Sequence, residues 1–313
     1  MRWRVLISCP HLQKTIDKYR DIFRENDIDI DLPSVTQALS ESDLIKIIEN
    51  YDGIIAGDDE ITAEVLKKAK KLKVISKWGV GIDAIDIETA EKLGISVFNT
   101  PDVFGDEVAD MVLGYLLLLA RKIHVIDKKV REGEWNGAQI QGISLRNKTL
   151  GVIGIGSIGR SVVERGRAVG MNILGYDVFP IDSSFLEKYN LRQVDLNTLL
   201  SESDFISLNC NLTASNYHMF REGEFGKMKT TAYLVNTSRG ALIDEKALIK
   251  ALNTGKIAGA ALDVFEKEPL PMDSPLRTFD NCILGAHNSS NTVDAVFRVN
   301  SLAIENLIRG LNE

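Results

Sequence analysis

Three side chains that can move protons or hold an anion stand at the ends of apolar runs late in the chain. Arg239 follows the run from Ala232 to Val235, and Glu268 lies in the segment ALDVFEKEP. His287 comes after the segment CILGA. The carboxyl ends of parallel strands face a common crevice, where functional side chains belong. Each has a plainer interpretation when taken alone: a surface arginine, a solvated turn carboxylate and a structural histidine.

A glycine-rich turn upstream of these residues predicts a phosphate-binding site. The apolar run from Leu150 to Ile155 has strand length, and Gly154, Gly156 and Gly159 follow in G-x-G-x-x-G spacing. In this motif the first glycine permits a tight turn, the second lets a pyrophosphate approach, and the third lets the helix pack on the strand. The phosphates would bind where the helix begins near Ser157, because unpaired N–H groups favour negative charge there.

A carboxylate completes the motif. Asp177 ends the apolar strand from Ile173 to Tyr176, 18 residues after Gly159, where an acid can reach the ribose hydroxyls. Glycine-rich helix starts also occur for packing alone, but the strand, helix and acid in this order favour a dinucleotide site. No arginine or lysine occurs in the three following residues, and an anionic side chain repels a 2′-phosphate. The segment therefore predicts NAD in preference to NADP.

The composition is that of an ordinary globular protein of about two domains. The 313 residues are 44% hydrophobic and 26% charged, with a net charge of −7, which argues against a general nucleic-acid binder. Cys9, Cys210 and Cys282 are far apart, so neither a disulfide framework nor a thiolate zinc site is expected. The start lacks a signal-peptide core, and the apolar run from Met111 to Ala120 is half of the roughly 20 residues that cross a bilayer. We predict a cytoplasmic protein with no membrane or nucleic-acid partner.

Apolar runs that alternate with amphipathic segments predict an α/β fold with parallel sheets. Early strands are expected at RVLIS, IDIDL, GIIAG, VIS and ISVF, with helices over LQKTIDKYRDIFREN, 42–50 and 62–71. One long helix is expected from Asp106 through EGEW, and its strongly apolar first half should be buried between larger units. Alternation resumes after Thr149, and an amphipathic helix over 292–309 ends the chain. The charge run from Asp58 to Glu60 is expected to be a solvated loop and not a metal site.

The order of these motifs resembles the NAD-dependent D-isomer specific 2-hydroxyacid dehydrogenases, particularly their D-3-phosphoglycerate dehydrogenase branch. The motifs are GIGSIG, Asp177, NTSRG, DVFEKEP and a late histidine, and KWGVGIDAID and NTP match as well. The resemblance covers nearly the whole chain. It implies two doubly wound parallel-sheet domains, one Rossmann-like and one flavodoxin-like, with a cleft between them. Residues 1–98 plus 289–313 would bind the substrate, and residues 99–288 would bind NAD.

The resemblance implies hydride transfer between C2 of a D-2-hydroxy acid and C4 of nicotinamide. His287 would be the base in oxidation and the acid in reduction, since an imidazole titrates near pH 6.5, roughly neutral. Glu268 would bond its other ring nitrogen, and Arg239 would hold the substrate carboxylate and polarise the C2 oxygen. Backbone N–H groups of Val80 and Gly81 would bind the carboxylate from the other domain.

The same resemblance assigns further residues to ligands. The cofactor-binding set would be Gly154, Gly156, Ser157, Ile158, Gly159, Asp177, Thr100, Asn209, Cys210, Thr237 and Asp263, with Asp263 facing the carboxamide. Lys77 stands where the phosphoglycerate branch tends to be basic, and it would pair with a phosphate or second carboxylate unless it is merely solvated. The long helix from Asp106 suggests a homodimer. Since the chain ends at Glu313, no serine-binding regulatory domain is expected.

Several positions depart from the usual family pattern. Asn209-Cys210-Asn211 stands where histidine and proline are common, and Ala84 stands within a usual GxDN. Ala286 replaces a proline, and Asn288-Ser289-Ser290 replaces a glycine-containing turn. We therefore expect the His287 loop to be less rigid, or shaped for another substrate. The other histidines are expected to be structural: His11, His124 and His218.

Three other functions are open. One is a glyoxylate- or hydroxypyruvate-type reductase, and another is a dehydrogenase acting on formate or phosphonate. The third is a non-catalytic NAD-sensing corepressor or scaffold on the same fold. The presence of Arg239, Glu268 and His287 argues against the last. Turnover of 2-keto acids with NADH separates these alternatives.

Overall fold

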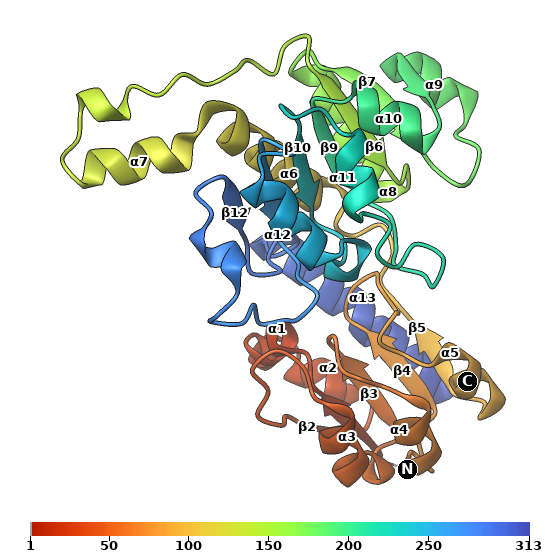
Figure 1. Cartoon of the computed structure of the whole chain (residues 1–313). Helices are drawn as coiled ribbons and strands as arrows, with labels where there is room; N and C mark the ends of the chain where they lie inside the picture. The colour runs from red at the N-terminus through yellow and green to blue at the C-terminus, as the bar shows by residue number, and fades with distance from the viewer. Residues whose placement is uncertain (1) are drawn as a thin grey trace. The chain divides into compact units, whose positions relative to one another are not determined.

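The computed structural model describes residues 2–313 and divides the chain into two compact units. Unit 1 comprises Met1–Val103 and Asn291–Glu313, and unit 2 comprises Phe104–Ser290. The sequence analysis predicted domain boundaries after residues 98 and 288, whereas the two units of the structure meet after residues 103 and 290. Each unit contains one sheet of parallel strands with helices packed on it (Figure 1). The prediction of two doubly wound parallel-sheet domains is confirmed.

Unit 1 has a five-stranded sheet in the order β2-β1-β3-β4-β5. This is one of the common doubly wound orders, in which ligands bind beside the point where the strand order reverses. Its strands are β1 (Trp3–Ile7), β2 (Ile28–Asp31), β3 (Gly53–Ala56), β4 (Val74–Lys77) and β5 (Ser96–Phe98). Its helices before the crossing are α1 (Pro10–Gln13), η1 (Ile16–Lys18), α2 (Arg20–Glu25), α3 (Glu41–Ile47), η2 (Ile48–Asn50), α4 (Ala63–Lys68) and α5 (Ile87–Lys92).

The last helix of the chain, α13 (Val293–Asn312), belongs to unit 1. It packs on β3, β4 and β5, and the Ser76 hydroxyl of β4 donates a hydrogen bond to the carbonyl oxygen of Ala303 at 2.7 Å. The helix expected over residues 12–26 is broken into three short pieces, because Thr15 leaves helical geometry with φ −121° and ψ 11°. Asn300 of α13 donates a hydrogen bond to the Thr15 hydroxyl at 3.0 Å, which holds this break.

Unit 2 has a seven-stranded sheet in the order β12-β11-β10-β9-β6-β7-β8. Its central strand β6 lies between β7 and β9, which is the Rossmann arrangement with one added edge strand. The strands are β6 (Thr149–Ile153), β7 (Asn172–Tyr176), β8 (Leu191–Gln193), β9 (Phe205–Leu208), β10 (Tyr233–Asn236), β11 (Gly259–Leu262) and β12 (Cys282–Leu284). The ligand crevice of such a sheet lies outside the carboxyl ends of β6 and its neighbours.

Helices cover both faces of this sheet. One apolar cluster joins the sheet to α10 (Leu196–Glu202), α11 (Glu222–Lys227) and α12 (Glu245–Asn253). The other joins it to α6 (Gly105–Arg121), α8 (Ser157–Ala168) and α9 (Ser183–Tyr189). The remaining short helices are η3 (Asn136–Ala138), η4 (Gly240–Leu242) and η5 (Pro275–Thr278).

The long helix expected from Asp106 is two helices. Lys122 takes the left-handed conformation with φ 52° and ψ 37°, which ends α6 and begins α7 (Ile123–Arg131). The apolar first half, α6, is buried against α8 and the sheet. By contrast, α7 has no buried residue. Among residues 2–313, no helix combines the length and apolar character that a membrane crossing requires.

Candidate active site

The glycine-rich turn joins β6 to α8. Gly154 has φ +88°, and a Cβ atom on Gly159 would lie 1.9 Å from the carbonyl oxygen of Gly154, so only glycine permits this close approach. Gly156 differs, because its Cβ position meets no described atom within 4 Å beyond its chain neighbours. Open backbone therefore lies beside Gly156 where α8 begins at Ser157. Helix N-termini of this kind donate N–H groups to a diphosphate.

Asp177 lies directly after β7, at the edge of the same turn. One carboxylate oxygen accepts a hydrogen bond from the backbone N–H of Ile155 at 2.6 Å. The other accepts from the N–H of Phe179 at 2.9 Å. These bonds orient the carboxylate beside the glycine turn, in position for hydroxyl donors. Ile158, the second residue of α8, packs against the apolar cluster beneath the turn.

The other residues predicted to bind the cofactor in unit 2 follow neighbouring strands. Asn209 and Cys210 come after β9, Thr237 after β10 and Asp263 after β11. Burial raises the pKa of the Cys210 thiol to about 11, so this side chain is neutral. The Thr237 hydroxyl is buried and has no hydrogen-bond partner among the described residues, which is unusual unless a ligand supplies one. Together with the open backbone at Gly156, these groups fit a dinucleotide.

His287 and Glu268 are in direct contact. The ring Nδ1 of His287 lies 2.7 Å from Oε2 of Glu268, and both side chains are partly buried. The other carboxylate oxygen, Oε1, accepts a hydrogen bond from the N–H of Phe265 at 3.0 Å. With the carboxylate fixed at both oxygens, Nδ1 carries the proton of the neutral ring. Nε2 is then the ring atom that takes up and releases a proton.

The loop that carries His287 is tied to Asp263. The backbone N–H of His287 donates to the carbonyl oxygen of Asp263 at 2.7 Å. Oδ2 of Asp263 accepts from both the N–H and the hydroxyl of Ser289, at 2.8 and 2.5 Å, and the Tyr115 hydroxyl donates to Oδ1 at 3.3 Å. His287 itself has φ 52°. Ser289, which departs from the usual family pattern, thus supplies two bonds that anchor this loop to a buried carboxylate.

Replacing Ser289 by alanine tests this anchor. We expect a loss of about 1.5–3 kcal/mol in the free energy of unfolding, since a hydroxyl bond to a charged group is removed. We also expect kcat to fall about tenfold, because small displacements of a reacting group are costly. Thermal unfolding and steady-state kinetics measure the two effects. The matched control is Ser290→Ala, and equal effects of the two variants would contradict the anchoring role.

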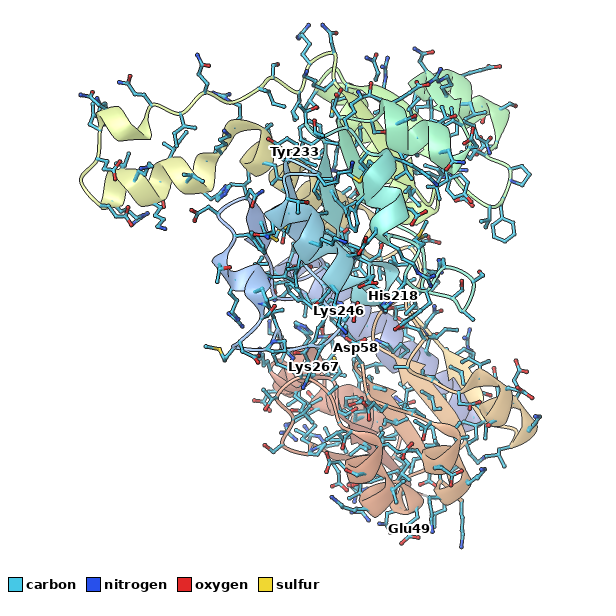
Figure 2. The ribbon with its side chains drawn as sticks, viewed as in Figure 1. Glu49, Asp58, His218, Tyr233, Lys246 and Lys267 are labelled. Carbon is cyan, nitrogen blue, oxygen red and sulfur yellow. The ribbon has the colours of Figure 1, made fainter. Side chains whose placement is uncertain are left out.

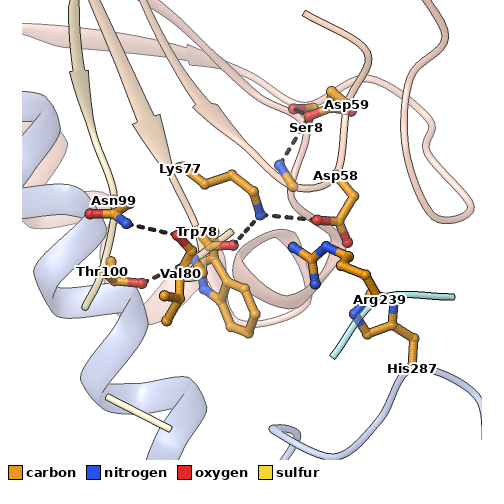
Figure 3. A network of polar contacts seen from close by, with 12 residues as sticks. Ser8, Asp58, Asp59, Lys77, Trp78, Val80, Asn99, Thr100, Arg239 and His287 are labelled. Carbon is orange, nitrogen blue, oxygen red and sulfur yellow. Dashed lines mark hydrogen bonds and ion pairs between the residues drawn. The ribbon is translucent and has the colours of Figure 1, made fainter. Parts of the chain in front are cut away.

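Arg239 stands between β10 and η4. Its Nη1 donates to the carbonyl oxygen of Ser238 at 3.0 Å, and its own carbonyl accepts from the Asn236 side chain at 2.8 Å. A Cβ atom on Gly240 would lie 1.9 Å from the carbonyl carbon of Phe265, so the Arg239 loop presses against the backbone that leads to Glu268. Figure 3 shows the side chains of Arg239 and His287 reaching from separate loops into the same region.

In unit 1, the turn after β4 contains the two N–H groups that were predicted to bind a carboxylate. Thr100 is buried; its N–H donates to the Gly79 carbonyl and its hydroxyl accepts from the Gly79 N–H, both at 3.0 Å. Asn99 donates to the Val80 carbonyl at 2.7 Å. Within residues 2–313, the N–H groups of Val80 and Gly81 donate no hydrogen bond to another residue. Asn99 and Thr100 therefore hold the turn (Figure 3) without using the N–H groups of Val80 and Gly81.

Lys77 and Asp59 are buried, whereas Asp58 and Glu60, on either side of Asp59, are exposed. Lys77 is buried, and its Nζ lies 3.1 Å from Oδ1 of Asp58. Asp59 is 1% exposed and accepts hydrogen bonds from the Ser8 hydroxyl and two backbone N–H groups. The interpretation as a solvated loop is wrong for Asp59, which anchors the loop internally, whereas Asp58 and Glu60 have exposed side chains. The described residues contain no group of three side chains suited to a metal ion.

Sequence reasoning missed Tyr115, Ser289 and Asp58. A hydroxyl inside the apolar run of α6 was the available signal for Tyr115, and a carboxylate two residues after a buried strand was the signal for Asp58. The other histidines have local contacts. His11 stacks on Trp78 with ring centroids 4.7 Å apart. Nε2 of His124 lies 3.1 Å from the carbonyl oxygen of Asp280. Nε2 of His218 lies 3.0 Å from Oε1 of Glu266.

Comparison with known sequences decides the family. Residues 113–289 match the family described as D-isomer specific 2-hydroxyacid dehydrogenase, NAD binding domain. The chain belongs to this family. It is an NAD-dependent oxidoreductase, and its cofactor is NAD. The matched segment contains the glycine turn and the strand ends that carry Arg239, Glu268 and His287.

Relatives with different names are similar to this chain. A glyoxylate reductase of Thermofilum pendens is 43% identical over 86% of this chain and 81% of its own length. A D-3-phosphoglycerate dehydrogenase of Methanocaldococcus jannaschii is 42% identical over 87% of this chain. The match covers only 52% of the length of that relative. The crystal structure of an Aquifex aeolicus D-lactate dehydrogenase complexed with NAD and lactic acid has a TM-score of 0.86 at 29% identity, covering 96% of this chain and 93% of that one.

Proposed function

We propose that this protein interconverts a D-2-hydroxy acid and its 2-keto acid, with NAD as hydride carrier. The observation that carries the proposal is the 2.7 Å contact between Nδ1 of His287 and Glu268. In reduction, protonated Nε2 of His287 gives its proton to the C2 oxygen, and in oxidation the neutral ring removes it. Glu268 fixes the tautomer and stabilises the charged ring. The nicotinamide, when bound, accepts or supplies the hydride at its C4.

Arg239 and the unit 1 turn would hold the substrate. A guanidinium presents a planar set of donors that suits a carboxylate and the adjacent C2 oxygen. The N–H groups of Val80 and Gly81 would bind the same carboxylate. Unit 1 would thus be the substrate-binding domain, predicted as residues 1–98 plus 289–313, and unit 2 the NAD-binding domain, predicted as residues 99–288.

The NAD site would be built at the ends of the central strands of unit 2. Backbone N–H groups at Gly156 and the start of α8 would hold the diphosphate, and Asp177 would accept from the ribose hydroxyls. Thr237 and the neighbouring strand-end residues would line the nicotinamide pocket, with Thr100 contributing from unit 1. Two substrate classes follow from the relatives' names. One is phosphorylated, as for phosphoglycerate, and the other is glyoxylate or hydroxypyruvate.

The test is NADH oxidation by the purified protein with glyoxylate, hydroxypyruvate, pyruvate and phosphohydroxypyruvate. We expect turnover of at least one acid, and kcat/KM for NADPH about tenfold or more below that for NADH, because Asp177 repels a 2′-phosphate. Asp177→Ser should narrow this gap. NADH binding without any turnover would instead support a binding-only protein, and turnover of formate or phosphonate alone would support another oxidoreductase.

We also propose that the protein is a cytoplasmic homodimer joined through the segment around α7. Figure 1 shows α7 extending away from the sheet of unit 2. Its exposed apolar residues include Ile123, Val130 and, after the helix, Trp135, which is 75% exposed. Such a surface is suited to burial against a second copy. Light scattering should give a dimer mass that Trp135→Glu lowers, and a monomeric wild type at working concentration would contradict the proposal.

A further inference from the structure

The ion pair between Lys77 and Asp58 sits beside the turn that we assign to substrate binding. Lys77 is the last residue of β4, and its side chain is 4% exposed, whereas that of Asp58 is 45% exposed. The lysine Nζ lies 3.1 Å from Asp58 and donates to the Trp78 carbonyl at 2.8 Å (Figure 3). A Cβ atom on Gly79 would lie 3.2 Å from Nζ. The ammonium is therefore directly beneath the turn that presents Val80.

The charge of Lys77 is already matched from within unit 1. A buried ammonium requires a partner, and Asp58 provides one at ion-pair distance. A second carboxyl group, that of Asp59, lies close enough for the charge of Lys77 to oppose the burial that raises the pKa of Asp59. One ion-paired carboxylate and a second carboxyl group nearby thus accompany one ammonium here. This corner offers no excess positive charge to an incoming anion.

Binding a phosphate or a second carboxylate of the substrate beside the ion pair of Lys77 and Asp58 would be unfavourable. To reach Lys77, this anionic group would have to separate the ammonium from Asp58. The displaced carboxylate would then stay close to the new anion, and like charges a few ångströms apart repel strongly in a partly buried site. A hydrogen atom or a hydroxyl group meets no such repulsion, and a hydroxyl can bond with the exposed carboxylate of Asp58.

We propose that Asp58 determines substrate specificity: by pairing with Lys77, it selects 2-keto acids that lack a second anionic group and rejects phosphorylated ones. The inference rests on the proposed function, because it requires the substrate carboxylate to bind at Val80 and Gly81. It reverses the role first expected for Lys77, which was to attract a phosphate. Glyoxylate and hydroxypyruvate fall in the selected class.

The test compares hydroxypyruvate with its phosphate ester, which differ only in the second anion. We expect the wild type to favour hydroxypyruvate by about tenfold or more in kcat/KM, as expected for one uncompensated charge near the site. Asp58→Asn removes the carboxylate that forms the ion pair with Lys77, and we expect the ratio to move about tenfold toward the phosphate ester. The control is Glu49→Gln, which removes an exposed charge at the opposite end of unit 1 and should leave the ratio unchanged (Figure 2).

The results distinguish a failure of the specificity role of Asp58 from a failure of the proposed function. A wild type that prefers the phosphate ester, or an Asp58→Asn ratio equal to that of the wild type, overturns the specificity role while the proposed function stands. If no 2-keto acid is reduced, the proposed function fails and the specificity role fails with it. Adding Lys77→Met to Asp58→Asn should abolish the gain for the ester. If circular dichroism shows that these buried-site variants do not fold, the wild-type ratio alone still supports or overturns the specificity role.

Discussion

Replacing His287 by glutamine is expected to lower kcat for 2-keto acid reduction about 1000-fold, because positioned acid catalysts contribute roughly this much. Glutamine keeps a polar side chain that can hydrogen-bond, but it cannot give up a proton at neutral pH. NADH affinity should change little, since the glycine turn and Asp177 lie on other loops of unit 2. Stopped-flow NADH oxidation measures the first effect, and NADH fluorescence titration measures the second.

The companion variant, Glu268→Gln, separates proton transfer from mere structure. An amide can still bond to Nδ1 of His287, but it no longer stabilises the charged ring. We expect kcat for reduction to fall less than in His287→Gln, and the decline of reduction with rising pH to begin at a lower pH. The control is Glu266→Gln, two residues earlier in the same loop. If His287→Gln keeps more than about a tenth of the wild-type rate, His287 is not the acid.

The fold was largely predictable because its signals are local. Buried parallel strands are visible in the sequence as short apolar runs. In the glycine turn, close backbone contacts leave no room for a Cβ atom, as at Gly159. The break at Lys122 was not predictable, since no glycine or proline marks it and a left-handed lysine costs energy that only the tertiary structure can offset. The prediction of one continuous helix over residues 12–26 was wrong for a similar reason. Its break at Thr15 is held by Asn300, which lies far along the chain.

The contact between Glu268 and His287 was predictable in kind but not in detail. Strand-end positions placed Glu268 and His287 at one edge of a sheet, and the structure brings them to 2.7 Å. The contacts that support them depend on residues distant in sequence, as in the bonds from Ser289 and Tyr115 to Asp263. Asp59 shows a different error. A run of acidic residues is usually solvated, but Asp59 is 1% exposed, because the Ser8 hydroxyl and two backbone N–H groups bond to its carboxylate inside the loop.

Replacing Arg239 by lysine is expected to lower kcat/KM for the 2-keto acid about 100-fold, because the planar fork of donors is lost and the substrate is held less accurately. The positive charge remains, so a purely electrostatic role predicts a much smaller effect. The backbone should be undisturbed, since the loop is fixed by the contact of Gly240 with Phe265 and by the bond from Asn236. Steady-state kinetics with varied keto acid, at saturating NADH, measures the change.

Two further measurements make this prediction specific. In Arg239→Ala, added guanidinium should restore part of the activity, because a small planar cation can occupy the vacated space and bond the carboxylate in the same way. The matched control is Arg221→Lys, an exposed arginine at the start of α11, which should behave as wild type. If Arg239→Lys were as active as wild type, the substrate carboxylate would have to be held by the unit 1 turn alone. That result would move substrate binding entirely onto Val80 and Gly81 and leave Arg239 with the structural role that its bond to Ser238 already provides.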